Sequence, residues 1–333
     1  MEIERPNNSE NQAEFAGSII ESRSVAKRGK WLKLAQVHDE VWLQGQPVEK
    51  PDSFLTALRM SSLNADLFTF AQSIPETTPK YSYHMEWDNL AVAPTSDFKK
   101  WWESLPQESR KNVRRSERRG VVTRQVEFDD ALVAGIKKIY DEAPIRQGRR
   151  FWHYGKSLET VKKENSSYLE RSQFIGAYFQ DELIGFIKMV NVGPTARIMQ
   201  ILSMNGHFDK RPTNALLTKA AEICHQRGLS YLIYGQYIYG KKANSQITEF
   251  KRRTGFEQLL LPRYFIPLTA KGKIALALKL HRGIRELLPE PITDFLLKKR
   301  MAYYERKMNL AKTNATPNVV KAETDGVERA ETI

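Results

Sequence analysis

One stretch, residues 196–256, constrains the fold of this chain more than any other. It opens with an apolar run at 196–204 that is typical of a buried strand, followed by a polar and basic turn at 205–211. At 212–227, apolar residues recur three or four positions apart, as they do on one face of an amphipathic helix. A second apolar run follows at 229–237. Strand, helix and strand in this order predict two parallel strands joined by a helical crossover.

The turn before this helix carries the cations Lys210 and Arg211. The first backbone amides of a helix have no partner within the helix, and the helix dipole favours negative charge beside them. A basic turn at this position therefore predicts an anion-binding site.

The same stretch carries a resemblance to a known family. The strand, the turn at 210–214, the helix, the second strand, Asn244 and then Gly255-Phe256 resemble the acyl-CoA-binding half of the GNAT N-acyltransferase superfamily. In that family an asparagine commonly lies eleven residues before a closing Gly-Phe, as Asn244 does here. The basic run at 110–121 and the pair Phe250-Lys251 further resemble the BioF2-like and Fem-type branch. The resemblance covers roughly residues 90–268.

This resemblance implies an α+β fold. The expected sheet is GNAT-like, mixed and mostly antiparallel, with one parallel crossover and helices on both faces. A partial N-terminal lobe and C-terminal helices complete it. The expected divisions are a disordered leader at 1–22, the partial lobe at 23–95, the GNAT-like acyltransferase domain at 96–268, a helical appendage at 269–310 and a disordered tail at 311–333.

Two hairpins are also expected from the local pattern of apolar runs around short polar or proline-containing links. One joins 31–37 to 41–43, and the other joins 257–261 to 264–268 around Pro262.

The resemblance implies that acyl-CoA, with acetyl-CoA preferred, is the co-substrate and that no metal takes part. The residues it assigns to the cofactor are Lys210, Arg211, Thr213, Asn214, Asn244 and Lys251. The turn departs from the family, which usually has glycines there, and Pro212 offers no amide donor. An altered or lost donor therefore stays open. Asn244 is equally well interpreted as the N-cap of the helix that follows.

Acyl transfer to an amine needs a group that takes a proton from the amine and one that returns a proton to the leaving thiolate. Tyr237 and Tyr239 follow the second parallel strand, where the family often places the thiolate's proton donor. His153 is the first candidate for the base, with His207 behind it, because a histidine titrates near neutrality. A core tyrosine and a structural histidine are the competing interpretations.

The segment at 144–155 mixes arginines, aromatic residues and a histidine without a helical or strand period. Polar groups in such an irregular segment need partners, which favours a binding role. In the GNAT arrangement this position grips the acceptor, so the candidate substrate-binding residues are Arg146, Arg149, Trp152 and Tyr154. A packed aromatic loop with surface arginines is the alternative.

The net charge of +13 over 333 residues favours phosphate-bearing partners. Six cations lie at 110–119, where Val113 alone is available for burial, so this helix predicts an anion-binding or polynucleotide-facing surface. A single cysteine, Cys224, excludes an internal disulfide and is expected to be a buried structural thiol. With no apolar leader, the expected location is cytoplasmic, with peripheral contact to an anionic membrane left open.

The sequence therefore predicts an N-acyltransferase that acts on a small-molecule or precursor amine, such as a cell-envelope or polysaccharide precursor. Two alternatives remain. One is a Fem-type transferase that takes its acyl group from aminoacyl-tRNA, with the basic helix contacting the RNA. The other is a non-catalytic binding protein on the same scaffold. Metal-ligand spacings, phosphate-binding glycine loops and hydrolase nucleophile motifs are not found in the sequence.

Overall fold

The structure is a computed structural model that describes residues 17–146, 149–240 and 245–283, together with 299 and 306. The chain forms two compact units. The first includes 17–142 and 153–283, and the described part of the second includes 143–146 and 149–152. In the second unit, β7 (Ile145–Arg146) and β8 (Arg149–Arg150) pair as two short antiparallel strands.

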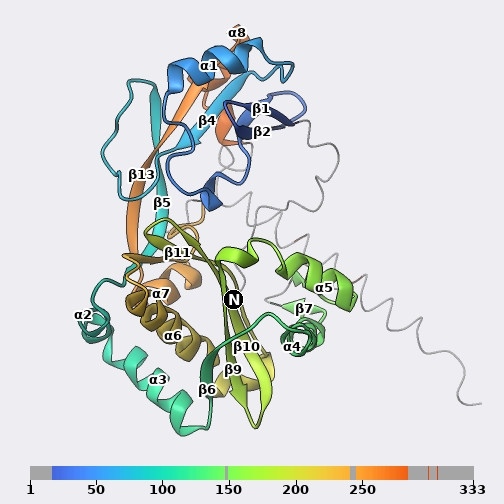
Figure 1. Cartoon of the computed structure of the whole chain (residues 1–333), viewed down its shortest axis with the longest axis vertical. Helices are drawn as coiled ribbons and strands as arrows, with labels where there is room; N and C mark the ends of the chain where they lie inside the picture. Colours follow the sequence, from blue (N-terminus) through green and yellow to red (C-terminus); the bar gives the residue numbers. More distant parts are fainter. Residues whose placement is uncertain (1–16, 147–148, 241–244, 284–298, 300–305, 307–333) are drawn as a thin grey trace, which may run out of the picture. The chain divides into compact units, whose positions relative to one another are not determined.

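One continuous sheet runs through the first unit (Figure 1). Its strands are β1 (Gly17–Ile20), β2 (Arg23–Arg28), β3 (Leu34–Val37), β4 (Leu67–Ala71), β5 (His84–Pro94), β6 (Val122–Val126), β9 (Ser172–Phe179), β10 (Glu182–Val192), β11 (Thr195–Ser203), β12 (Tyr231–Ile233) and β13 (Glu257–Pro267). Their spatial order is β1-β2-β3-β4-β13-β5-β12-β11-β10-β9-β6. The pairs β3–β4 and β11–β12 are parallel, and the other neighbours are antiparallel. The predicted α+β class and mixed sheet are confirmed, with β3–β4 as a second parallel pair.

The helices of the first unit start where their capping residues lie. The α-helices are α1 (Pro51–Met60), α2 (Phe98–Ser104), α3 (Gln107–Arg118), α4 (Asp130–Asp141), α5 (Leu158–Asn165), α6 (Pro212–Gln226), α7 (Gln246–Arg253) and α8 (Ala270–Ala277). Single 3-10 turns are η1 (Glu40–Trp42), η2 (Leu169–Arg171), η3 (Asn205–Lys210) and η4 (Leu280–Arg282). Side chains of Asp97, Asp129 and Ser157 each accept a hydrogen bond from an amide of the first turn of α2, α4 and α5.

The crossover that the sequence singled out is present as β11, α6 and β12. The helix ends at Gln226, within a residue of the expected span, and Gly228 after it takes a left-handed φ of 68° and donates from its amide to the carbonyl of His225 at 3.0 Å. Cys224 lies on the buried face of this helix, and burial raises the pKa of its thiol to about 12, so the thiol stays protonated. It is a structural residue, as predicted.

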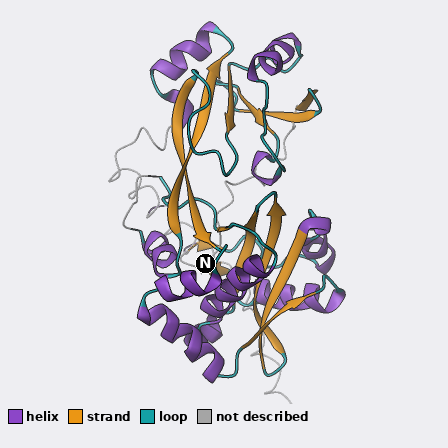
Figure 2. Ribbon diagram, turned by 60° about the vertical axis from the view of Figure 1, so that its left-hand side comes forward, coloured by secondary structure: helices purple, strands orange, loops and turns teal. Residues whose placement is uncertain are grey.

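Helices cover both faces of the sheet around β9 to β12 (Figures 1 and 2). On one face α6 packs with α2, α3 and the end of α7. The indole of Trp101 on α2 donates to the carbonyl of Gly255, just after α7, at 3.1 Å. Only glycine fits at position 255, because its φ is 81° and a Cβ there would lie 2.5 Å from Leu105. The other face carries α4 and α5.

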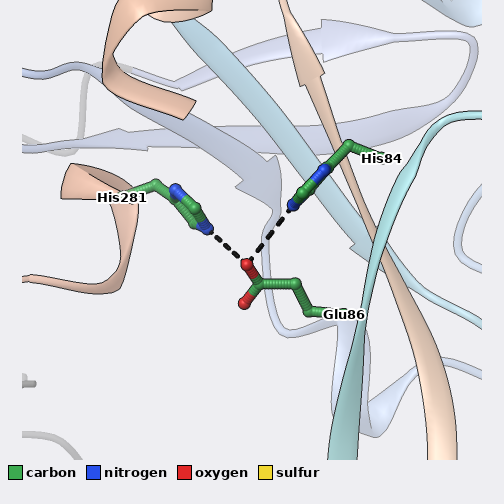
Figure 3. A group of neighbouring side chains, drawn as sticks. All are labelled: His84, Glu86 and His281. Atoms are coloured by element: carbon green, nitrogen blue, oxygen red, sulfur yellow. Dashed lines mark hydrogen bonds and ion pairs between the residues drawn. The ribbon is translucent and has the colours of Figure 1, made fainter. Parts of the chain in front are cut away.

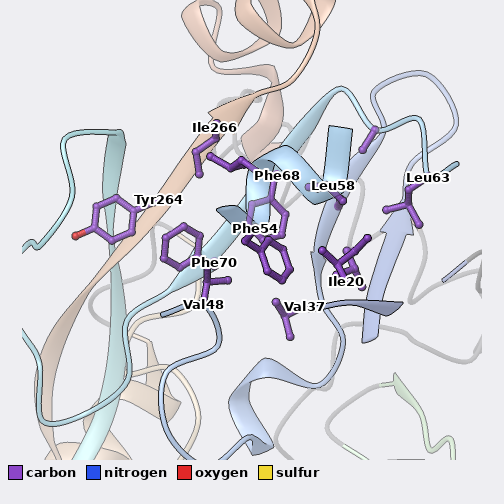
Figure 4. Close-up of a cluster of buried hydrophobic side chains, with 14 residues drawn as sticks. Ile20, Val37, Val48, Phe54, Leu58, Leu63, Phe68, Phe70, Tyr264 and Ile266 are labelled. Carbon is purple, nitrogen blue, oxygen red and sulfur yellow. The ribbon is translucent and has the colours of Figure 1, made fainter. Parts of the chain in front are cut away.

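The strands of the N-terminal part bury a second hydrophobic core, shown in Figure 4. Phe54 of α1 stacks on Phe68 of β4 with ring centroids 5.2 Å apart, and Phe70 lies 5.2 Å from the ring of Tyr264 on β13. Each of these side chains is at most 2% exposed. Burying an aromatic side chain of this kind contributes roughly 1.5–3 kcal/mol, so this part of the chain has a core of its own.

The hairpin expected at 257–268 is wrong. Residues 257–267 form the single strand β13, which pairs with β5 along its length and with β4 from Arg263 onward. The carbonyl of Pro262 accepts from the amide of Gln72, so the nitrogen of Pro262 faces the β4 side as well. The β4 ladder begins only at Arg263, so this position needs no amide donor and proline is tolerated there.

The hairpin expected at 31–43 is also wrong. β3 pairs with β2 and β4 instead, and residues 40–42 form η1 after Asp39, which has a left-handed φ of 53°. The predicted leader is also too long, since Gly17–Ile20 forms β1 against β2. Asn244, most of the expected appendage beyond 283 and the expected tail lie outside the described residues. The domain boundaries themselves stay predictions.

Among the described residues, none of the helices has the length and apolar character that crossing a bilayer requires.

A cluster of charged groups ties η4 to β5 (Figure 3). The rings of His84 and His281 point at the Glu86 carboxylate, with Nε2–Oε1 distances of 3.4 and 2.9 Å. These groups have metal-ligand spacing, within 4.8 Å of one another. However, Arg282 donates to both Glu86 oxygens at 3.0–3.1 Å and so already balances the carboxylate's charge. We interpret the group as an ion-pair cluster.

Glu86 should make stability depend on acidity. Burial alone would raise the pKa of its carboxyl, but hydrogen bonds from Arg282, His281 and His84 outweigh burial and hold that pKa below its usual range. The stabilisation is therefore complete above the ordinary value of 4.5 and is lost as the pH falls through the lower folded-state pKa. Glu86→Gln should lower the free energy of unfolding by roughly 1–3 kcal/mol at pH 7, and the difference should shrink towards pH 3.

Urea titrations of both proteins between pH 3 and 7 measure this difference. The exposed pair partner of Lys80, Glu76, provides the control variant Glu76→Gln, which should change stability little. A Glu86→Gln deficit that is the same at every pH would contradict the assignment.

Candidate functional site

The two parallel strands of the crossover part soon after they meet. β11 and β12 pair through Thr195–Tyr231, Ala196–Leu232 and Arg197–Ile233 and no further. Beyond Ile233 the chain follows β5 instead, since Tyr234 donates to the carbonyl of Ala91 at 2.8 Å. Residues 198–203 of β11 therefore keep β10 on one side and leave β12 on the other.

A bulge marks the point where the strands part. Lys188 pairs with Gln200 but Met189 pairs with Ile198, so Met199 is an extra residue on β11. A bulge bends its strand and redirects side chains and backbone groups. Here it begins two residues after the last parallel pair and adds to the divergence of the two strands.

On the α4–α5 face, a polar network built around His153 meets β11 beside the bulge. The imidazole stacks on Tyr140 with centroids 4.3 Å apart, and its Nε2 lies 3.3 Å from Nε2 of Gln200. The hydroxyl of Tyr140 donates to Oε1 of Gln200 at 2.8 Å. Because Oε1 is the acceptor in that bond, the Gln200 amide nitrogen faces His153 as a donor, and the ring nitrogen there is an acceptor.

The second ring nitrogen of His153 faces Glu164 of α5, at 3.5 Å. Burial alone would raise the pKa of this carboxyl, but hydrogen bonds with His153 and Lys156 hold it below its usual range. Lys156 also contacts Glu164 directly at 2.6 Å. An imidazole oriented by a carboxylate, with an acceptor nitrogen towards β11, can take a proton from a group bound beside Gln200.

The turn at 205–211, which precedes α6, is less open than the sequence suggests. The amides of Asn205 and Gly206 donate to the carboxylate of Glu142 at 2.7 and 2.8 Å. An oxyanion therefore already lies on the first amides of this turn. Asp209 pairs with Arg119 at 2.8 Å and with Lys210 at 3.6 Å, so part of the local positive charge is compensated.

Arg211 takes the role that glycines usually have in such a turn. It is the N-cap of α6 with a left-handed φ of 55°, and its side chain makes no capping bond. A non-glycine residue in this region costs about 1–3 kcal/mol and is found most often at functional sites. Thr213 bonds Ser203 at 3.0 Å between their hydroxyls, and Asn214 faces α3 and Trp101.

On the α7 side, Lys251 and Tyr239 lie together after β12. The Lys251 side chain is completely buried, and its amine donates to the carbonyls of Tyr234 and Gln236. Its Nζ is 3.4 Å from the hydroxyl of Tyr239. Burial lowers the pKa of Lys251 to about 7 and raises the pKa of Tyr239. Lys251 therefore holds the chain that continues β12, and its own amine is not exposed.

The structure shows other contacts for the remaining predicted residues. Tyr237 contributes its carbonyl to Thr248 of α7. Arg146 of β7, Arg149 of β8 and Trp152 belong to the second unit, where the guanidinium carbon of Arg146 lies 4.7 Å from the ring centroid of Phe151. Tyr154 lies in the first unit and is half-exposed.

Sequence reasoning missed Gln200, Tyr140, Glu164 and Glu142, which complete these groups. Within the apolar run at 198–202, Gln200 is the one polar residue. That pattern was a usable signal. The others are ordinary polar residues of helices, and only the fold brings them to β11.

The α3 helix is the most basic surface of the first unit. Ser109, Val113 and Ser116 are buried against α6 and α7, which leaves the cations outward. The outward residues Lys111, Arg114, Arg115 and Arg118 surround an open surface hollow. All of them belong to one helix, so the feature is a charged patch and not an enclosed pocket.

The buried amine of Lys251 should give stability a slope in mild base. Its folded-state pKa of about 7 lies below the ordinary 10.5, so between these values the unfolded chain holds the proton more tightly. Unfolding free energy should then rise with pH, by on the order of 1–2 kcal/mol from pH 7 to 9. Lys251→Met should remove this rise.

Guanidinium titrations at pH 7, 8 and 9 test the slope. Lys99→Met, at an exposed position, is the control and should keep the wild-type slope. An unchanged slope in Lys251→Met would show that other groups cause it.

No family model matches the chain, and no curated protein matches it by sequence. Solved structures do match. One is a DUF2156 domain from Agrobacterium fabrum, described as the C-terminal domain of a lysylphosphatidylglycerol synthetase, with 14% identity, 79% of this chain and 86% of that chain covered, and a TM-score of 0.51. Another is FemX, with 10% identity, 76% and 85% covered, and a TM-score of 0.50. At these identities the likeness concerns the fold alone. Together with the diverging β11 and β12, it identifies the fold of this chain as GNAT-like, shared with FemX and the DUF2156 domain.

Proposed function

We propose that this chain is an N-acyltransferase that moves an acyl group to an amine, with the reaction taking place where β11 and β12 part. The observation that carries the proposal is the arrangement at the bulge of β11. A proton acceptor, His153, faces β11 on one side of the sheet, and Tyr239 with Lys251 follows β12 on the other. The strand edge between them has lost its neighbour and is free to receive a donor's carbonyl.

The proposed steps use each group once. The acceptor amine attacks the carbonyl carbon, and its surplus proton passes to Nε2 of His153. The tetrahedral intermediate then collapses and the bond to the leaving sulfur or oxygen breaks. That leaving group takes a proton from the hydroxyl of Tyr239, and Lys251 next to it, with a pKa lowered to about 7 by burial, can replace it.

Acyl-CoA is the first candidate donor, with acetyl-CoA preferred and the diphosphate at Lys210, Arg211 and the start of α6. The six residues 198–203 of β11 have no partner on the β12 side, which is about 20 Å of strand. This length suits an extended pantetheine arm. The acceptor is an amine of a small molecule or of a cell-envelope or polysaccharide precursor.

A second candidate donor is aminoacyl-tRNA. Two observations favour it: Glu142 places a carboxylate on the amides of Asn205 and Gly206 in the turn before α6, and α3 presents four outward cations. The names of the neighbours, a lysylphosphatidylglycerol synthetase and FemX, agree with such a donor. A non-catalytic scaffold remains the third alternative.

His153→Gln should lower kcat by roughly 10²–10³-fold while the protein stays folded, because glutamine keeps a polar group but cannot take the proton. Thiol release from acetyl-CoA with a panel of amines measures the rate. His225→Gln is the matched control, since His225 is exposed at the end of α6 and contacts only a backbone carbonyl. Full activity in His153→Gln would remove it from the mechanism, and no thiol release from wild type with any amine would eliminate acyl-CoA as donor.

The donor can be identified by binding. If CoA phosphates lie at the start of α6, Arg211→Glu should abolish CoA binding, and Glu142→Gln should tighten it several-fold by removing a competing carboxylate. Calorimetric titration with CoA measures both.

If the donor is aminoacyl-tRNA, Arg211→Glu and Glu142→Gln should change tRNA binding little. Arg114→Gln with Arg118→Gln should instead weaken tRNA binding and lower the slope of log affinity against log salt by about 1–2. Salt-dependent filter binding with bulk tRNA measures that slope. Binding of neither donor would favour the non-catalytic alternative.

A further inference from the structure

Arg197 of β11 is a half-buried cation whose Nε is shielded from solvent and has no partner among the described residues. No hydrogen bond or ion pair links its guanidinium to any residue that the structure describes. Burial lowers the pKa of Arg197 to about 10, although Glu40 opposes the shift, so the group is still charged at neutral pH. A guanidinium with five donors normally finds acceptors when it is removed from water.

Glu40, the nearest carboxylate, is already engaged. One of its oxygens accepts from Arg263 of β13, and the other accepts from the amide of Ala71 at 3.4 Å. Arg263 is further held by Asp88 at 2.6 Å. In this group Arg28 and Arg197 are therefore the cations whose charge no hydrogen-bonded carboxylate balances among the described residues.

Arg197 also lies at the point where β11 and β12 stop pairing. It forms the last parallel pair before β11 and β12 part. It pairs with Val190 on β10, whereas Gln200 pairs with Lys188, two residues earlier on the same strand. Directly paired residues lie on one face, and so do residues two apart in a strand. Arg197 and Gln200 therefore face the same side of the sheet, the side on which His153 lies.

We infer that Arg197 binds an anionic group, a carboxylate or a phosphate, carried by the amine acceptor. Arg197 offers the paired donors that such groups accept. The predicted phosphate site at the start of α6 is about 20 Å away along β11, so a donor that places its phosphates there leaves Arg197 to another molecule. Assigning the anion to the acceptor rests on the proposed function, but anion binding at Arg197 does not. An anion at Arg197 would set the acceptor's amine near Gln200 and His153.

Binding of small anions tests the inference without any acyl donor. Thermal-shift and calorimetric titrations use sodium phosphate and sodium succinate, with sodium chloride at equal ionic strength as the reference. We expect wild-type protein to bind phosphate or succinate beyond the chloride response, and Arg197→Met to bind it at least tenfold more weakly. The control Arg59→Met, at an exposed position of α1, should bind as wild type does.

The melting temperature without anion gives an independent readout. Arg197→Met should melt at the same temperature or higher, because it replaces an unbalanced, half-buried cation by an apolar side chain of similar length. If Arg197→Met does not fold, Arg197→Lys keeps the charge without the paired donors and should bind several-fold more weakly than wild type. Response to phosphate alone would identify a phosphorylated acceptor, and response to succinate alone a carboxylate. No response beyond chloride, or undiminished binding by the variants, would overturn the inference. Neither result depends on whether acyl transfer is observed.

Discussion

The loss of hydrogen bonding between β11 and β12 after Arg197–Ile233 is the constraint on which the rest of the site depends. Backbone amides and carbonyls of a strand need partners, and those of 198–203 that face β12 do not find them there. The bulge at Met199 begins beside this point, and β12 turns away to follow β5. An interior strand therefore presents an open edge inside the sheet. An extended ligand can supply the missing strand contacts, which is the physical basis for placing a donor there.

The same parting of strands separates the chemical groups. His153 reaches β11 through Gln200 from the α4–α5 face, whereas Lys251 reaches the continuation of β12 from α7. Each group is held by its own hydrogen bonds, so neither depends on the other for its position. Acid and base on opposite sides of one opening can serve successive proton transfers without neutralising each other.

The positive charge of the chain is distributed unevenly once the structure is considered. Glu249 holds Arg252 and Arg253, Asp209 holds Arg119 and Lys210, and Glu40 with Asp88 holds Arg263. These cations are structural or compensated. The outward cations of α3 form no ion pair with a carboxylate among the described residues, and neither does Arg197, whose Nε is buried. Net charge indicated an anionic partner, and ion pairing narrows the positions at which one would bind.

The sequence by itself determined the elements whose signals are local. The apolar period at 212–227 predicted α6 and its buried face correctly, because that signal depends on residues within one or two turns. Tertiary structure decided the partners of strands. Pro262 looked like a turn, yet it lies inside β13 because its nitrogen falls outside the β4 ladder, and β3 pairs with strands that no local pattern could indicate. The site follows the same division. Lys210 and Arg211 were visible in the sequence, but Glu142, Gln200 and Arg197 acquire their roles only through contacts between distant segments, where burial and lost solvation change what a charge does.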